Sequence, residues 1–273
     1  MDEAEFSVVI PAKNRSAMLG RAISSALQQT LPPKEIIVVD DGSDEPDFFL
    51  LSEKFPQVKW LRQKNKGVSA ARNRGIEMAS CQWIALLDSD DLWHEEKLLS
   101  QSRFIGKNPD IPAVHTDERW IRSGNEVMPP KYLDKSPNGL WERSLENCLI
   151  CASSIAIHQS VFEKIGLFDE ELEVCEDYDF WLRMLLEVQV GLVPEKLVTK
   201  HGGHPDQLST STWGMDRFRV QSLKKLLRHK GLTNQMSEKV RQVLSLKCSI
   251  LEQGARKRKK FSQADYFAQL ANS

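Results

Sequence analysis

Three carboxylates crowd into one short stretch, Asp88-Ser-Asp-Asp91, directly after the apolar run Ile84-Ala-Leu-Leu87. Four consecutive apolar residues predict a buried strand, so the acidic residues lie on the loop at its carboxyl end, where open α/β sheets bind ligands. Carboxylates this close repel one another, and such oxygen ligands suit Mg²⁺ or Mn²⁺ holding a phosphate-bearing substrate. The stretch therefore predicts a metal–diphosphate site. The alternative is an acidic loop that caps the helix expected after it.

A second expected strand also ends in carboxylates. The strand predicted over 35–39 is followed by Asp40, Asp41 and Gly42. A carboxylate at this position could accept a hydrogen bond from a base N–H or from ribose hydroxyl groups, while the glycine permits a tight turn. The alternative is an Asp-Gly turn that joins a strand to a helix. Such a turn does not explain why two strands end in acidic residues.

Basic residues gather at an expected helix start. Lys66, Arg72 and Arg74 lie at and just inside a helix whose apolar residues begin at Val68. Backbone N–H groups at a helix N-terminus, together with arginine side chains, suit phosphate oxygens. The alternative is a solvated basic face. It is favoured for Arg74 but less for Arg72, which lies among small residues.

A further acidic pair opens a helix. Glu176 and Asp177 precede an amphipathic pattern that includes Phe180, Trp181 and Met184. A carboxylate at this point could take the proton from an attacking hydroxyl group, and the helix N-terminus favours its ionised form. The alternative is helix capping, because acidic residues also stabilise the first turn of a helix.

The elements that position these residues alternate between strands and helices. Strands are expected over 6–10, 35–39, 58–61 and 84–87, with helices over 16–27, 48–55 and 68–79 between them. This order predicts βαβ units and a mainly parallel sheet. Later elements are a helix over 94–106, strands over 113–121, 154–157, 190–193 and 197–200, a helix over 159–165, and a loop over 124–138. The pattern turns helical near residue 214, so we expect a domain over 1–213 and a helical extension over 214–273.

Composition excludes several classes of protein. The net charge of −1 and the 41% hydrophobic content indicate a globular protein without a basic surface for nucleic acid. The acidic N-terminus does not resemble a signal peptide, and no apolar run reaches the roughly 20 residues that cross a bilayer. Five cysteines do not indicate a disulfide framework. We therefore expect a cytoplasmic protein. The basic run Arg256–Lys260 is typical of a solvated helix end, and the alternative is peripheral contact with anionic lipid headgroups at the inner face of the membrane.

Six motifs in order resemble glycosyltransferase family 2 over roughly residues 5–210. They are Ile10–Asn14, Val39–Ser43, Asn65–Gly75, Leu87–Asp91, Gly166–Asp169 and Glu176-Asp177. The resemblance implies the GT-A fold, a Rossmann-like α/β sheet flanked by helices. It also implies transfer of a sugar from a nucleotide diphosphate with inversion at the anomeric carbon.

The resemblance also implies roles for single residues. Asp40 would hold the nucleobase, usually uracil, with Asp41 beside it, and Asp177 would be the general base. Asp90 would coordinate the metal, joined by a histidine near the last strand, for which the spacing favours His204 over His201. The remaining donor contacts would come from Pro11, Ala12, Asn14, Arg72, Asp88 and Ser89.

The residues and the resemblance together predict an inverting glycosyltransferase that depends on Mn²⁺ or Mg²⁺. Its donor would be a UDP-sugar and its acceptor a hydroxyl group of a glycan or lipid-linked molecule, in surface polysaccharide synthesis. Trp120 is a candidate acceptor contact. A sugar-phosphate nucleotidyltransferase is an alternative, but it would carry a Gly-rich basic loop where this chain has Pro11-Ala-Lys-Asn14. A non-catalytic binding module is another, although it would not need Asp90 and Asp177.

Overall fold

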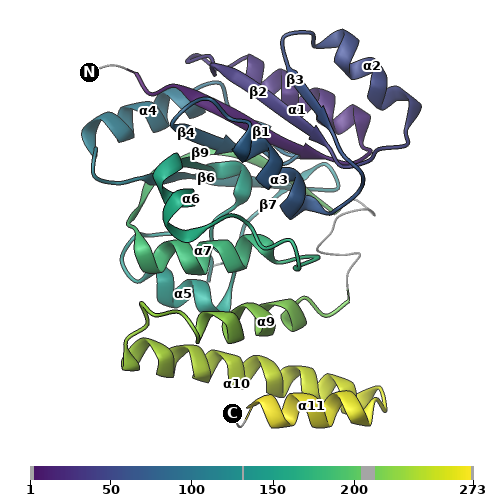
Figure 1. Cartoon of the computed structure of the whole chain (residues 1–273), viewed down its shortest axis with the longest axis vertical. Helices are drawn as coiled ribbons and strands as arrows, with labels where there is room; N and C mark the ends of the chain where they lie inside the picture. The colour runs from purple at the N-terminus through teal and green to yellow at the C-terminus, as the bar shows by residue number, and fades with distance from the viewer. Residues whose placement is uncertain (1–2, 131, 204–212, 272–273) are drawn as a thin grey trace.

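One β-sheet with helices on both faces forms most of the molecule, and further helices follow it (Figure 1). The computed structural model describes residues 3–130, 132–203 and 213–271. The sheet positions the candidate site, because it brings distant segments of the chain to one edge.

The N-terminal half of the sheet is parallel, as the alternation of strands and helices predicted. Its elements are β1 (Phe6–Ala12), α1 (Ser16–Leu27), β2 (Glu35–Asp40), α2 (Pro46–Lys54), β3 (Lys59–Arg62), α3 (Val68–Glu77) and β4 (Trp83–Leu86). The strands lie in the order β3-β2-β1-β4, so the strand order reverses at β1. Their carboxyl ends meet at one edge, and open α/β sheets bind ligands at such a switch point.

The second half of the sheet is mixed. Its elements are β5 (Leu92–Trp93), α4 (Lys97–Lys107), β6 (Ala113–Arg122), β7 (Asn125–Val127), α5 (Leu140–Glu146), β8 (Ile155–His158), α6 (Gln159–Ile165), α7 (Glu176–Glu187) and β9 (Val190–Gly202). β8 runs antiparallel between β4 and β6, and β9 runs parallel to β6. β5 and β7 pair antiparallel with β9 and β6. Parallel pairing therefore holds for the first four strands and for one later pair.

Two expected segments differ from the structure, and β5 and α5 were not predicted. The expected loop over 124–138 contains β7, which forms a hairpin with β6. The two strands expected over 190–193 and 197–200 are one strand, β9, whose pairing with β6 shifts register after Val193 and again between Lys196 and Val198. The first shift lies at Pro194, which has no N–H group to donate to the ladder, so the irregularity bends the strand there without ending it.

Helices cover both faces of the sheet. Apolar side chains of α1, α2 and α4 pack on one face, and those of α3, α6 and α7 on the other. α3 lies close to β1 because Gly75 has no side chain. A Cβ atom at this position would lie 2.3 Å from Cγ1 of Val9, which is closer than atoms can pack. The glycine thus sets how closely the C-terminal part of α3 packs on β1.

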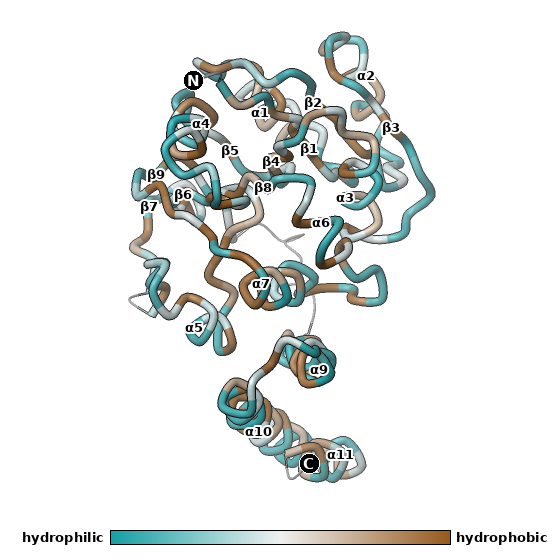
Figure 2. The backbone as a smooth tube through the Cα atoms, turned by 60° about the vertical axis from the view of Figure 1, so that its left-hand side comes forward, coloured by the Kyte–Doolittle hydropathy of each residue, from teal (hydrophilic) through white to brown (hydrophobic). Residues whose placement is uncertain are grey.

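The C-terminal segment is helical, as predicted. It contains α9 (Asp216–Leu226), α10 (Asn234–Lys257) and α11 (Phe261–Ala271). α9 packs beneath α7, and α10 and α11 form a hairpin farther from the sheet (Figure 2). One apolar cluster joins them to α5 and α7 and includes Leu145, Tyr178, Phe218 and Val240. A domain boundary at residue 214 stays a prediction. Within the described ranges, no helix combines the length and the apolar character that a bilayer span requires.

Candidate active site

One pocket of about 600 Å³ lies where the parallel strands end. Its walls come from the segments after β1, β2 and β4, the starts of α3 and α7, and the end of β9. The sequence-predicted site residues that line it are Pro11, Ala12, Asn14, Asp41, Arg72, Asp88, Ser89, Asp90 and Asp177. Residues up to 166 positions apart in the chain, from Pro11 to Asp177, therefore converge on one cavity.

Asp41, and not Asp40, faces this pocket. The Oδ1 atom of Asp41 accepts a hydrogen bond from the N–H of Lys66 at 2.8 Å, and its Oδ2 atom accepts one from the N–H of Gly67 at 2.9 Å. Asp40 is absent from the pocket wall, and its Oδ1 atom accepts the N–H of Ser43 at 2.7 Å. Asp40 therefore holds the turn after β2, and Asp41 joins that turn to the start of α3.

Arg72 is a buried cation between two carboxylates. It is 4% exposed, and its Nη2 atom lies 2.6 Å from Oδ1 of Asp88 while its Nη1 atom donates to Glu176. The two carboxylates outweigh burial and raise the pKa of Arg72, which stays charged. Its guanidinium group also lies 5.4 Å from the ring centroid of Phe168. Arg72 therefore links the end of β4 to the start of α7.

The carboxylates of the acidic turn after β4 all line the pocket, and they divide into half-buried and buried members. Asp88 and Asp90 line the pocket, and Oδ2 of Asp90 pairs with Nη1 of Arg15 at 3.1 Å. Asp91 is 2% exposed and accepts hydrogen bonds from Oγ of Ser153 at 2.6 Å and from the N–H of His201 at 3.0 Å. Burial, together with the charges of Asp90 and Asp88, raises the pKa of Asp91 to about 7. Asp91 thus fixes the end of β9 against the turn.

Asp88 and Asp90 are the carboxylates of this turn that could hold a divalent cation together with a substrate phosphate. Among the described residues, no group of three or more His, Cys, Asp or Glu side chains forms a metal-binding cluster. Asp88 and Asp90 nevertheless reach the same pocket, and Mg²⁺ is commonly held by one or two carboxylates together with substrate phosphates. Burial is the main cause of the raised pKa of Asp91, and the nearby charges of Asp90 and Asp88 add to it. His204 lies outside the described residues, and His201 lines the pocket.

Glu176 and Asp177 of α7 both line the pocket, and Asp177 is the more exposed of the two. It is half-buried, and its Oδ2 atom accepts a hydrogen bond from the thiol of Cys148 at 3.3 Å. Glu176 is buried against Arg72, and burial raises its pKa to about 7, although Arg72 pulls the pKa down. Asp179 pairs with Arg183 at 2.9 Å and supports the packing of α7. At the start of α7, Asp177 is therefore the candidate for contact with a ligand, whereas Glu176 and Asp179 form ion pairs with arginines.

Several pocket residues escaped the sequence analysis. Lys200 lines the pocket from the end of β9, and its Nζ atom lies 5.4 Å from the ring centroid of Trp120. The available signal was its place at the end of the strand expected over 197–200. No sequence signal marks Arg15, whose left-handed backbone turns its side chain to Asp90.

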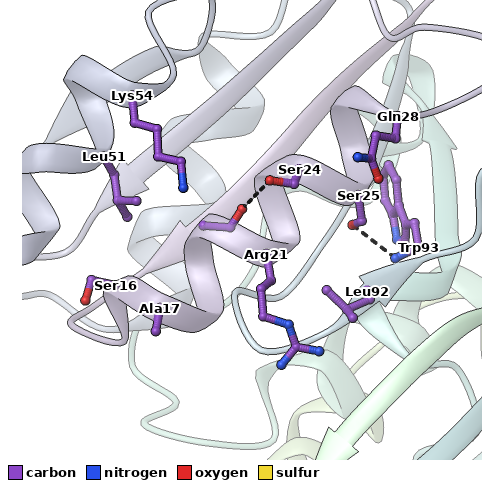
Figure 3. Close-up of a pocket in the computed structure, with 11 residues that line it drawn as sticks. Ser16, Ala17, Arg21, Ser24, Ser25, Gln28, Leu51, Lys54, Leu92 and Trp93 are labelled. Carbon is purple, nitrogen blue, oxygen red and sulfur yellow. Dashed lines mark hydrogen bonds between the residues drawn. The ribbon is translucent and has the colours of Figure 1, made fainter.

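A second hollow lies on the outer side of α1 (Figure 3). It measures about 460 Å³, and α1, α2 and β5 line it. The charged side chains drawn there, Arg21 and Lys54, are both basic, and the Oγ atom of Ser24 donates to the carbonyl of Gly20 at 2.8 Å. Because this hollow lacks a carboxylate in its described lining, the pocket at the strand ends is the candidate active site.

Comparisons with known proteins agree with the likeness in the motifs. The family model described as "Glycosyl transferase family 2" matches residues 7–166, which is more than half of the chain. An uncharacterized glycosyltransferase of Rickettsia conorii is 30% identical over 199 residues, covering 72% of this chain and 33% of the relative. The chain thus spans about a third of that relative's length.

A second relative and a solved structure extend the comparison. The Escherichia coli protein named UDP-Glc:alpha-D-GlcNAc-diphosphoundecaprenol beta-1,3-glucosyltransferase WfgD is 29% identical over 199 residues, covering 71% of this chain and 74% of that protein. The structure of S. aureus TarS 1-349 in complex with UDP-GlcNAc superposes with a TM-score of 0.70 at 19% identity. The superposition covers 88% of this chain and 70% of TarS 1-349. This likeness confirms the GT-A fold, with its sheet flanked by helices.

Proposed function

Because the chain belongs to glycosyltransferase family 2, we propose that it transfers a sugar from a UDP-sugar to a hydroxyl group of a lipid-linked glycan, with inversion. The observation that carries this proposal is the convergence of Asp41, Arg72, Asp88, Asp90 and Asp177 on one pocket. These residues supply, in one cavity, contacts for a nucleotide, cations and carboxylates for a diphosphate, and a proton acceptor.

The nucleotide would lie along the ends of β1 and β2. Pro11, Ala12 and Asn14 line this part of the pocket, and Asp41 replaces Asp40 as the carboxylate that accepts a hydrogen bond from the base. Asp88 and Ser89 line the same pocket and would face the ribose. The complex of TarS with UDP-GlcNAc supports a UDP-sugar, since the two folds match over most of this chain.

The leaving diphosphate develops negative charge that the pocket must stabilise. Arg15 and Lys200 line the same cavity as the buried guanidinium group of Arg72, so cations surround the proposed diphosphate position. Asp88 and Asp90 would hold a Mn²⁺ or Mg²⁺ ion, which supplies further neutralisation of the diphosphate when bound. Cations fixed before the reaction stabilise this charge without reorganising during it.

Asp177 would act as the general base. Its carboxylate takes the proton from the acceptor hydroxyl while the hydroxyl oxygen attacks the anomeric carbon, and the bond to the diphosphate breaks on the opposite side. A well-placed carboxylate contributes about 10²–10⁴-fold to such a step. The Cys148 thiol donates to Asp177 and thereby restrains the orientation of the base.

The acceptor would enter beside β6 and β9. The name of the E. coli relative, which specifies a diphosphoundecaprenol acceptor, supports a lipid-linked acceptor and a role in surface polysaccharide synthesis. Trp120 stays the candidate acceptor contact, because its ring adjoins Lys200 at the pocket wall. A cytoplasmic site of action also stays a prediction.

A donor screen tests the proposal. Thermal unfolding is measured with UDP-, GDP- and dTDP-sugars, each with and without Mn²⁺, because a ligand that binds only the folded protein raises its melting temperature. We expect the largest rise with a UDP-sugar and Mn²⁺ together. Products are then assayed with a nucleotide-sugar and with a nucleoside triphosphate plus a sugar phosphate. Release of UDP supports the transferase, release of pyrophosphate indicates a nucleotidyltransferase, and binding without turnover indicates a binding module.

A further inference from the structure

Three cations surround one exposed tryptophan at the start of the C-terminal helices. Trp213 is 42% exposed. The Cζ atoms of Arg217 and Arg258 lie 4.5 and 4.6 Å from its ring centroid, and the Nζ atom of Lys260 lies 5.3 Å away. Arg217 lies at the start of α9, whereas Arg258 and Lys260 belong to the turn between α10 and α11. Segments about 40 residues apart therefore build one basic and aromatic surface.

These cations have no carboxylate to neutralise them within the described part of the chain. The neighbouring Arg256 pairs with Glu252 at 2.8 Å and with Asp265 at 3.3 Å. No such pair exists there for Arg217, Arg258 or Lys260. We call the surface formed by Trp213, Arg217, Arg258, Lys259, Lys260 and Phe261 the tryptophan patch. Like charges gathered around one ring favour an anionic partner.

The turn that carries these charges is held by two backbone hydrogen bonds and has an unusual residue. The N–H of Lys259 donates to the carbonyl of Arg256 and the N–H of Lys260 to that of Ala255, each at 2.9 Å. This is the hydrogen-bond pattern of a Schellman C-cap, in which a left-handed residue follows the helix. Lys259 occupies that position with φ 58, where glycine is favoured. The chain thus places a lysine at a position where it is conformationally unfavourable, which adds charge to the patch.

The position and shape of the patch favour a flat partner. The hairpin of α10 and α11 lies at the end of the molecule farthest from the sheet (Figure 2), and its turn residues Arg258, Lys259 and Lys260 are exposed. Phe261, directly after the turn, is 59% exposed. Tryptophan and phenylalanine beside lysine and arginine are typical of surfaces that lie at the headgroup level of a bilayer. Nucleic acid, in contrast, is usually bound along a basic groove.

We propose that the tryptophan patch docks the protein on a membrane surface that contains anionic lipids. The basic side chains contact the lipid headgroups, and Trp213 and Phe261 enter the interface between headgroups and acyl chains. Because the whole chain has a net charge of −1, this attraction depends on the patch and not on the overall charge. Met215, two residues after Trp213, lines the candidate active site, so docking would bring that pocket close to a lipid-linked substrate.

Sedimentation with lipid vesicles tests the proposal without any nucleotide or acceptor, so its outcome is independent of the proposed transferase activity. The full chain is mixed with vesicles of phosphatidylcholine alone or with added phosphatidylglycerol. We expect binding only with the anionic lipid, and weaker binding as salt is raised. Each basic residue near such a surface contributes about fivefold to the partition coefficient. The triple variant Arg258→Gln, Lys259→Gln, Lys260→Gln should therefore bind about a hundredfold more weakly.

Two controls separate charge from folding. The triple variant Arg103→Gln, Lys107→Gln, Lys196→Gln removes the same charges from exposed positions outside the patch and should bind like the wild type. Lys259→Gly suits the left-handed turn, so it should unfold at the same or a higher temperature yet bind about fivefold more weakly. The proposal is wrong if the wild type ignores phosphatidylglycerol, if both triple variants lose binding equally, or if single-stranded nucleic acid binds the patch while vesicles do not.

Discussion

Replacing Arg72 with methionine removes the cation that joins β4 to α7. The variant leaves Asp88 and Glu176 facing each other across the site without their shared partner. Breaking a buried ion pair by removing one member destabilises a protein by about 3–5 kcal/mol. Asp88 can regain water because its side chain is 31% exposed, whereas Glu176, at 8%, cannot. We therefore expect a loss of about 3 kcal/mol at pH 8, mostly from Glu176.

This loss should depend on pH because Glu176 can become neutral. Its pKa is about 7 with Arg72 present, and it rises further once the attraction of Arg72 is removed. At pH 6 the buried carboxyl group is then protonated in both proteins. At pH 8 only the variant still favours the protonated form, so its loss should be about 1.4 kcal/mol larger than at pH 6.

Urea unfolding followed by tryptophan fluorescence at pH 6 and pH 8 measures both quantities. The double variant Arg72→Met, Glu176→Gln serves as the control, because it removes the group whose charge becomes unpaired. It should be more stable than Arg72→Met at pH 8 and lose the added pH dependence. The reasoning is refuted if Arg72→Met destabilises by less than about 1 kcal/mol at both pH values, or if Glu176→Gln does not change its effect.

Three further predictions concern stability and the base. Because the pKa of Glu176 is raised from 4.5 to about 7, the native protein still holds a proton in this pH range that the unfolded chain has released. The stability of the wild type should therefore fall as the pH rises through this range, by at most about 3 kcal/mol relative to Glu176→Gln. Thermal unfolding at several pH values measures this difference. Cys148→Ala should lower the turnover number several-fold, whereas Cys148→Ser, which can still donate to Asp177, should not; equal rates would exclude positioning by the thiol. Gly75→Ala should destabilise by about 1–3 kcal/mol in urea, because its methyl group would overlap Val9, and an unchanged midpoint would contradict the close packing of α3 on β1.

The sequence predicted the elements whose patterns are local. The first four strands are apolar runs with clear ends, and the helices between them have regular apolar spacing, so β1 to β4 and α1 to α3 lie within a few residues of their predicted positions. The short strands β5 and β7 were missed because two or three residues carry no periodicity. β5 is extended because it pairs with β9, which is distant in the chain. β7 is extended because it pairs with β6 across a turn.

The site residues likewise divide into those that local patterns predicted and those that only the structure reveals. The sequence placed Asp40, Asp90 and Asp177 in one cleft; Asp90 and Asp177 line the same pocket, whereas Asp41 lines it in place of Asp40. Which of two adjacent aspartates faces the pocket does not follow, because the strand alternates sides and the register at β2 decides between Asp40 and Asp41. The role of Ser153 in holding Asp91 also needed the structure, since 62 residues separate the two.

The transfer rate of Asp177→Asn, measured with a saturating UDP-sugar and Mn²⁺, tests the central claim most directly. The substitution keeps the size of the side chain and removes its ability to take a proton. Glu173→Gln, at an exposed carboxylate of the same pocket, is the matched control. We predict that Asp177→Asn keeps the thermal shift caused by the donor while transfer falls by about 10²–10⁴-fold. Transfer at the wild-type rate would contradict the assignment of Asp177 as the base.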